Sequence, residues 1–297
     1  MFRQRRGGRQ PSIATILLLT ELFQVATTSG IPPVTLVTIG LQILIFLRLI
    51  AVPWSNHYDV CLDVTHVIKH HQWIRLIASA FEHADDYHLY YNMISFLWKG
   101  RTLEQRFGPF KFLYMLIIFT LTCNATYIGL YYCLARLTGD YQYNSVCAIG
   151  FSGVIFALKV LTTYYWPVAA YTSVFGIPMA ARHAVWGELI FIQIVSPNAS
   201  FIGHLSGILV GLAYCKGPLR AFIDLTYHVL TAPIGLNDNH PGPQGQEYNQ
   251  HNYNEQNQGG YNRYYGGQAS YEEMRRRRGY NQPGFFGFNQ GPFFRTY

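Results

Sequence analysis

Residues 147–166 read CAIGFSGVIFALKVLTTYYW, a mostly apolar run of the length that a helix needs to cross a bilayer, about 20 residues. The run opens with a turn of small residues, Gly150-Phe151-Ser152-Gly153, and stops at Trp166-Pro167, where proline prevents the helix from continuing. Small residues at the start allow another helix to approach closely. The stretch therefore predicts a membrane-spanning helix that carries a serine on its first turn.

Similar runs recur along the chain, of which 50% is hydrophobic and 12% is charged. Apolar residues grouped in long blocks are typical of membrane proteins. We therefore expect an all-α membrane protein, a bundle of six transmembrane helices in a lipid bilayer, and no nucleic-acid partner. The predicted spans are residues 33–51, 86–100, 111–135, 147–166, 183–196 and 200–216.

The chain divides into three parts. Residues 1–30 form a cytosolic N-terminal segment with an interfacial helix over 12–28, and residues 31–217 form the bundle. Residues 218–297 form a cytosolic tail, which we predict to be mostly disordered, since after about residue 235 it is rich in Gly, Asn, Gln and Tyr and cannot bury enough apolar surface.

The orientation follows from the basic residues beside the spans. Lys and Arg cluster before the first span, after the second and after the sixth, which predicts that both termini are cytosolic. Lys69 and Arg75 lie in the first loop, residues 52–83, and oppose this assignment. The early turns of the second, fourth and sixth spans then lie together at the non-cytosolic end.

The cysteines are scattered, and no two have the spacing of metal ligands. Cys61 alone lies in a polar loop. We therefore predict neither a disulfide framework nor a metal site. The other four lie in or beside predicted spans: Cys123, Cys133, Cys147 and Cys215.

Lys159 lies inside the fourth predicted span and Glu188 inside the fifth. A charge at the centre of a membrane helix costs about 2.5–3.5 kcal/mol when it is unpaired. We predict that the two side chains pair with each other. The alternative is that each extends separately to the membrane interface.

Polar residues on the early turns of three spans predict a chemical site. Ser152 is a candidate nucleophile and His204 a candidate general base, since a neutral imidazole has the right pKa to take the proton of a serine. His88 and Asn92 lie one turn apart on the second span and are candidate donors to an oxyanion. Polar groups at membrane depth are costly, so their convergence indicates function.

No acidic residue is placed in the sequence to orient His204, which predicts a dyad rather than a triad. Phe156 lies one turn beyond Ser152, and we expect its ring to stack on the imidazole of His204. The backbone N–H of Ser152 is a further candidate oxyanion donor.

Other interpretations of these residues exist. Small residues such as Gly207 and Gly211 also serve close helix packing without chemistry, and so does a Gly-x-Ser-Gly tetrapeptide. A soluble esterase is excluded because its nucleophile turn requires glycine at position 154, which is Val154 here. A transporter is expected to have broken helices and internal repeats, and the sequence has neither.

The same residues resemble the rhomboid family of intramembrane serine proteases over about residues 30–217. Gly150-Phe151-Ser152-Gly153 is similar to the nucleophile motif of that family, and His204 to its base. His83, His88 and Asn92 resemble its second-span histidines and oxyanion asparagine. Glu104-Gln105-Arg106-Phe107-Gly108 is similar to the cytosolic Glu-x-Arg-x-Gly turn of the family. Two departures are Trp73-Ile74-Arg75, where many members have a Trp-Arg pair, and Phe156, where many members have Tyr.

The resemblance implies hydrolysis of a peptide bond in or beside the transmembrane segment of a protein substrate, without a metal or organic cofactor. Ser152 would attack, His204 would transfer the proton, and Gly150, Gly153, Phe156 and His83 would support the site. A non-proteolytic scaffold similar to the derlins, which bind misfolded membrane proteins and help to extract them, is the alternative.

Two shorter stretches are similar to the rhomboid-related protein 4 subfamily: Ile31-Pro32-Pro33-Val34-Thr35 and His83-Ala84-Asp85-Asp86. That likeness implies the endoplasmic reticulum membrane and degradation of unstable membrane proteins. The tail run 272–278 resembles a motif for the valosin-containing AAA ATPase, with a solvated basic run as the alternative. Its candidate partner-binding residues are Glu273, Met274, Arg275, Arg276, Arg277 and Arg278.

Overall fold

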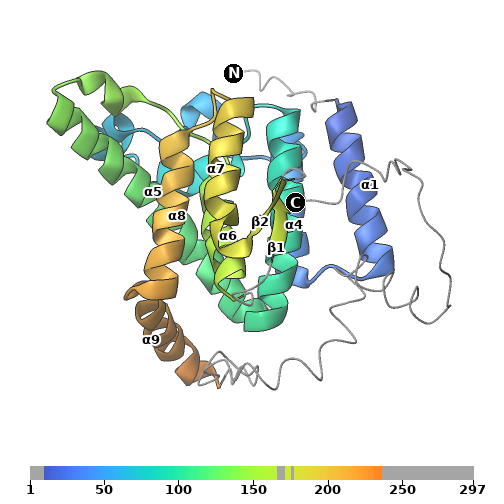
Figure 1. Cartoon of the computed structure of the whole chain (residues 1–297). Helices are drawn as coiled ribbons and strands as arrows, with labels where there is room; N and C mark the ends of the chain where they lie inside the picture. The colour runs from blue at the N-terminus through green and yellow to red at the C-terminus, as the bar shows by residue number, and fades with distance from the viewer. Residues whose placement is uncertain (1–9, 166–170, 175–176, 236–297) are drawn as a thin grey trace, which may run out of the picture. The chain divides into compact units, whose positions relative to one another are not determined.

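The computed structural model describes residues 10–165, 171–174 and 177–235, which are mostly helical (Figure 1). The main helices are α1 Ile13–Thr28, α2 Pro33–Phe46, α3 Arg75–Ala78, α4 Asp86–Phe107, α5 Pro109–Thr138, α6 Ser152–Tyr164, α7 Ala184–Val195, α8 Phe201–Lys216 and α9 Leu219–Thr231. Short helical turns are η1 His57–Asp59, η2 Thr65–Lys69, η3 Ser79–Phe81, η4 Tyr141–Ser145, η5 Ala181–His183 and η6 Ala232–Ile234. The strands are β1 Tyr171–Val174 and β2 Ile177–Ala180.

Each predicted span contains a helix, although the bounds differ. The fourth span was expected from residue 147, but α6 begins at Ser152 because Gly150, at φ +110°, has a backbone conformation outside the helical range. Within the described residues, α5 is the one helix that is long and apolar enough to cross a membrane by length and composition. α1, α2, α6 and α8 are apolar but shorter, so the count of six crossings stays a prediction.

One element departs from the predicted fold: β1 and β2 pair antiparallel, from Tyr171 opposite Ala180 to Val174 opposite Ile177, so the described chain is not wholly α. The helix α9, which was not predicted, follows α8 at the start of the tail, before the part expected to be disordered (Figure 1). Its Asp224 forms an ion pair of 2.7 Å with Lys111 of α5. The tail beyond residue 235, with the run 272–278, lies outside the described residues.

α2 packs antiparallel to α4 through a buried carboxylate. The Glu104 side chain accepts hydrogen bonds from the backbone N–H groups of Val34 at 2.8 Å and Thr35 at 2.7 Å. It also accepts one from the Thr35 hydroxyl at 2.7 Å. These are the free N–H groups of the first turn of α2, where negative charge is favoured. The Glu104–Gly108 turn of the sequence thus caps a neighbouring helix.

α1 lies lengthwise along α4 and runs in the same direction (Figure 1). The hydroxyl of Thr15 donates to Asp86 at 3.1 Å, and Arg101 donates to the carbonyl of Ser29 at 3.0 Å. The helix expected over 12–28 is thus present as α1, and its position at the membrane interface stays a prediction. The structure places residue 13 at the end of the bundle that holds the first turn of α4, whereas the arginine cluster predicted the opposite end.

α6 and α8 approach until their backbones touch. A Cβ atom added to Gly207 would meet the carbonyl carbon of Gly153 at 2.8 Å, and one added to Gly211 would meet the Ala157 oxygen at 2.8 Å. Only glycine fits at these two positions of α8. The glycines of the sixth span therefore do serve helix packing, as one interpretation of the sequence held.

Three charged residues of the bundle interior form a buried cluster. Lys159 Nζ lies 3.0 Å from Glu188 Oε2, which confirms the predicted pair. Lys99 of α4 is a third member, because its Nζ lies 3.9 Å from Glu188 Oε1 and donates to Ser95 Oγ at 2.5 Å. The cluster joins α4, α6 and α7.

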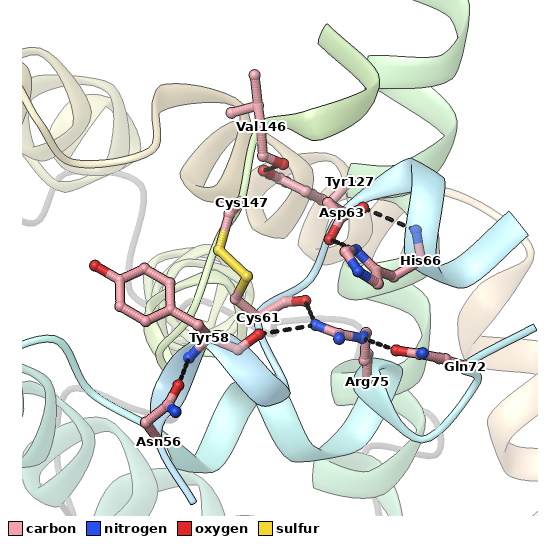
Figure 2. Close-up of a disulfide and its surroundings, with 10 residues drawn as sticks. All are labelled: Asn56, Tyr58, Cys61, Asp63, His66, Gln72, Arg75, Tyr127, Val146 and Cys147. Carbon is pink, nitrogen blue, oxygen red and sulfur yellow. Dashed lines mark hydrogen bonds and ion pairs between the residues drawn. A yellow bond between two sulfur atoms is a disulfide. The ribbon is translucent and has the colours of Figure 1, made fainter. Parts of the chain in front are cut away.

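A disulfide joins Cys61 of the first loop to Cys147 before α6, with the Cα atoms 5.6 Å apart (Figure 2). The prediction of no disulfide was wrong because Cys147 was assigned to the fourth span, whereas it lies in the segment before the helix. Arg75, which opposed the predicted orientation, is buried and donates to the Cys61 carbonyl at 2.6 Å. Its place in the first loop therefore reflects local structure.

We expect Gly207→Ala to lower the free energy of unfolding by about 1–3 kcal/mol, since the added methyl overlaps the backbone of α6. Gly129→Ala on α5 is the matched control, because a Cβ there meets nothing within 4 Å. Alanine favours helix, so this control should unfold at the same temperature or higher. Thermal unfolding of the purified protein in detergent measures both, and equal behaviour of the two variants would contradict the packing argument.

Glu188→Gln should lower stability by about 3 kcal/mol, because it leaves Lys99 and Lys159 buried together without their counter-ion. Adding Lys159→Met to Glu188→Gln should restore most of the loss, since the remaining Lys99 keeps its bond to Ser95. The melting temperatures of the three proteins in one detergent test this. Losses that simply add would show that the two side chains are not coupled.

Candidate active site

Ser152 is the first residue of α6 and is partly exposed. The preceding segment is fixed by the backbone N–H of Gly150, which donates to the Ser79 carbonyl at 2.9 Å. Position 150 has positive φ and its Cα faces an imidazole, so it requires glycine twice over. The Gly150–Gly153 motif thus forms a tight backbone turn that places the Ser152 hydroxyl on the first turn of α6.

His204 lies on the first turn of α8, which is capped by the Ser200 hydroxyl accepting from the Gly203 N–H at 3.1 Å. The imidazole is buried and stacks on Phe156, with ring centroids 4.6 Å apart and planes at 28°. This is the contact expected from the sequence. His204 Nδ1 has no hydrogen-bond partner among the residues that the structure describes.

The contact between α6 and α8 brings the two first turns together. A Cβ on Gly153 would lie 3.2 Å from the Gly203 carbonyl, so the residues next to Ser152 and His204 touch. In the described part of the chain, no hydrogen bond joins the Ser152 hydroxyl to His204. Catalytic hydrogen bonds are often long before substrate binds, so the dyad stays a prediction.

His88 lies on the first turn of α4, where Asp85 caps the helix by accepting the His88 N–H at 2.8 Å. Its ring lies against Gly150, because a Cβ there would approach Nε2 to 2.7 Å. Nδ1 accepts a long hydrogen bond from the Ala84 N–H at 3.4 Å, which leaves the proton on Nε2. A donor therefore faces the segment that leads to Ser152.

Asn92 is buried one turn further along α4, and its Nδ2 donates to the His88 carbonyl at 2.7 Å. An amide nitrogen carries two hydrogens, so one of them remains for another acceptor. The structure thus holds Asn92 directly below His88, as the spacing predicted.

His83 precedes α4, and its ring meets that of His88 edge to face at 5.0 Å. Both ring nitrogens are buried without a hydrogen-bond partner among the described residues. Burial, and secondly the nearby His88, lowers the pKa of His83 well below its ordinary value, so the ring is neutral near pH 7. His83 therefore supports His88 by packing.

Two contributors to the site were not selected from the sequence. Ser79 holds Gly150, and nothing in its local sequence indicated this. Asp85 caps α4, and an acidic residue just before an expected helix is a signal that predicts such a cap. Within residues 10–165, 171–174 and 177–235, no group of three or more His, Cys, Asp or Glu side chains is placed to hold a metal ion.

Comparison with known proteins shows the family of the chain. The family model described as "Rhomboid domain" matches residues 70–219. The chain is 40% identical over 243 residues to the mouse (Mus musculus) "Rhomboid-related protein 4", covering 82% of this chain and 73% of that protein. The chain belongs to the rhomboid family.

Other rhomboids are nearly as similar. The human (Homo sapiens) "Rhomboid-related protein 4" is 39% identical over 274 residues, which is 92% of this chain and 82% of that protein. "Rhomboid-like protein 14, mitochondrial" of Arabidopsis thaliana is 38% identical over 220 residues, 72% of this chain and 63% of that protein. This rhomboid is therefore a membrane protein, and its family membership supports a function of the intramembrane protease type. The matched domain contains α4, α6 and α8.

Gly150→Ala should disturb this rhomboid's site locally, because the added methyl would overlap the His88 ring and the residue would have to keep positive φ. We expect a loss of about 1–3 kcal/mol in unfolding free energy. Chemical denaturation in mild detergent gives the value. The same substitution at Gly40, where a Cβ meets nothing within 4 Å, should cost nothing, and equal losses at both sites would contradict the assigned geometry.

Proposed function

We propose that this rhomboid is an active intramembrane serine protease, with Ser152 as nucleophile and His204 as general base. The observation that carries the proposal is the meeting of three helix starts, with Phe156 on His204, Gly150 against His88, and α6 in backbone contact with α8. A rigid arrangement of nucleophile, base and donors is what acyl transfer requires.

In the proposed reaction, His204 takes the proton of the Ser152 hydroxyl as its oxygen attacks the carbonyl carbon of the substrate. The negative oxygen that forms accepts hydrogen bonds from His88 Nε2, from the second N–H of Asn92 and from the Ser152 backbone N–H. His204 returns the proton to the leaving amine. Water then hydrolyses the acyl-enzyme and frees Ser152.

The substrates that we propose are transmembrane proteins, because the site lies at the ends of apolar helices. A peptide bond within a helix is shielded from attack, so the substrate must unwind near the cut. A role in degrading unstable membrane proteins, and binding of the valosin-containing AAA ATPase by the tail run 272–278, rest on likeness to the rhomboid-related protein 4 relatives alone.

We propose the endoplasmic reticulum membrane as its location, with the C-terminal tail in the cytosol. The Cys61–Cys147 disulfide supports an oxidising compartment on the side of the first loop and the segment before α6. The basic residues Arg101 and Arg106 near the end of α4 and Lys216 at the end of α8 support the cytosol on the other side. Because α1 runs in the same direction as α4, we no longer propose a cytosolic position for residue 13.

The deciding experiment is cleavage of a single-span substrate by the purified full-length protein in liposomes. Ser152→Ala and His204→Ala should each lower the rate about a thousandfold or more. Ser196→Ala and His228→Ala, at exposed positions on other elements, are matched controls that should keep the wild-type rate. His88→Ala and Asn92→Ala should lower it about a hundredfold.

A different outcome would favour a second function. If folded wild-type protein makes no product from several substrates with helix-breaking residues, a derlin-like scaffold that binds misfolded membrane proteins becomes the better conclusion. The missing hydrogen bond between Ser152 and His204 in the described structure is the observation that favours it. Unchanged cleavage by Ser152→Ala would refute the dyad itself.

A further inference from the structure

The segment that leads to Ser152 is tied to the first loop at several points. The Cys61–Cys147 disulfide is one, and it joins residues 86 positions apart (Figure 2). Beside it, Leu62 and Ala148 exchange backbone hydrogen bonds of 2.8 and 3.0 Å. This contact between two loops ends at Ala148, four residues before the start of α6. The position of residues 146–150 thus depends on the first loop.

The first-loop residues around Cys61 are held firmly by hydrogen bonds and packing. The buried guanidinium of Arg75 donates to the carbonyls of Cys61 at 2.6 Å and Tyr58 at 3.3 Å (Figure 2). It also donates to Gln72 at 2.6 Å. Leu62 packs with Tyr127 of α5 in a buried apolar cluster. Cys61 is therefore held by its own surroundings, whatever the state of its sulfur.

On the other side, residues 146–150 make four hydrogen bonds to the first loop and α5 in the described chain. Two are those that Ala148 exchanges with Leu62; in the others Tyr127 donates to the Val146 carbonyl at 3.1 Å, and Gly150 donates to the Ser79 carbonyl at 2.9 Å. Cys147 itself is exposed, whereas Cys61 is buried. The disulfide is thus the one covalent bond that holds residues 146–150 against the first loop in the described chain, and its exposed half is accessible from solvent.

We propose that thiol–disulfide exchange at Cys61–Cys147 switches this protein between two states. In one state residues 146–150, the segment before Ser152, are ordered, and in the other they are mobile. The partner is a dithiol, either a small molecule or a protein with two neighbouring cysteines. This inference rests on the proposed function, because it assigns a regulator to the same site. The reduced state is the less active one.

The exchange balances without any further reactant. One thiolate of the dithiol attacks the Cys147 sulfur, forms a mixed disulfide and displaces the Cys61 sulfur as a thiolate. The second thiolate of the dithiol then attacks the dithiol sulfur of the mixed disulfide and releases Cys147 as a thiolate. Two electrons pass from the dithiol to the pair, the dithiol becomes a disulfide, and its two protons end on Cys61 and Cys147.

Reduction should leave the helix bundle intact. The contacts that join α6 to α8 at Gly153, Gly207 and Gly211 do not involve the disulfide, and neither does the buried cluster around Glu188. What changes is the freedom of residues 146–150, and with them the place of Gly150 against His88. The expected effect is therefore on rate and local order, with the fold retained.

The test uses full-length wild-type protein in liposomes, treated with dithiothreitol or left oxidised. Alkylation with a maleimide-polymer reagent counts the free thiols, and cleavage of a single-span substrate gives the rate. We expect reduction to lower the rate about fivefold or more and oxidised glutathione to restore it. Circular dichroism should show the same helix content in both states.

Cys61→Ser combined with Cys147→Ser should have the rate of the reduced protein and no response to dithiothreitol. Cys133→Ser, which removes an exposed free cysteine of α5, is the matched control and should respond as the wild type does. If the double variant does not fold, the reduction and reoxidation of wild type still decide the question.

Three results would overturn the inference. They are an unchanged rate in wild type whose Cys61 and Cys147 are both alkylated, an unchanged rate in the folded double variant, and free thiols at both positions in protein purified without reductant. If oxidised wild type cleaves nothing, the proposed function fails and amide hydrogen exchange of residues 146–150 becomes the readout. Faster exchange after reduction would then support the tie, and equal exchange would refute it.

Discussion

The contact between the backbones of α6 and α8 is the constraint on which the rest of the structure depends. Glycine at 207 and 211 lets the two helices touch at Gly153 and Ala157, and no side chain separates them there. Within a membrane, helices gain little from excluding water, so close packing of this kind does much of the work of association. Ser152 and His204 each lie next to or one turn from this contact, so its geometry carries directly into the proposed site.

Two different kinds of interaction hold the bundle together. At one end, polar side chains meet in the turns that begin α4, α6 and α8. Further along the same helices, Lys99 and Lys159 meet Glu188 of α7. A buried charge is tolerated only with its counter-ion, so this cluster specifies which helices are neighbours. Two independent interactions, close packing and the buried charge cluster, therefore fix the helices that carry the proposed site.

Much of this arrangement follows from local patterns in the sequence. The helix positions follow from apolar runs, and the meeting of His88 with Gly150, and of Phe156 with His204, follows from placing alternate helices in the same direction. The Lys159–Glu188 pair follows from the cost of unpaired charge. The period of apolar residues is a property of a single segment, and an unpaired buried charge has few possible partners. Both can therefore be read from one sequence.

The features that were missed depend on contacts between distant segments. The disulfide needs two loops to meet, and Cys147 was hidden by an expected helix start five residues too early. The direction of α1 depends on Thr15 and Ser29 meeting α4, and charge counting pointed the other way. The pair β1–β2 has no strong pattern of its own, whereas α9 has a strongly amphipathic pattern from which that helix could have been predicted. The dyad itself is still a prediction, because no hydrogen bond joins Ser152 to His204 in the described chain.

The disulfide also has a meaning for biogenesis. Between Cys61 and Cys147 lie α4 and α5, the outgoing and returning helices of a hairpin. In the predicted topology α4 and α5 cross the membrane in opposite directions, so Cys147 reaches the compartment of Cys61 only after both helices have been synthesised and inserted. Under that topology, the closed disulfide reports that the hairpin is complete.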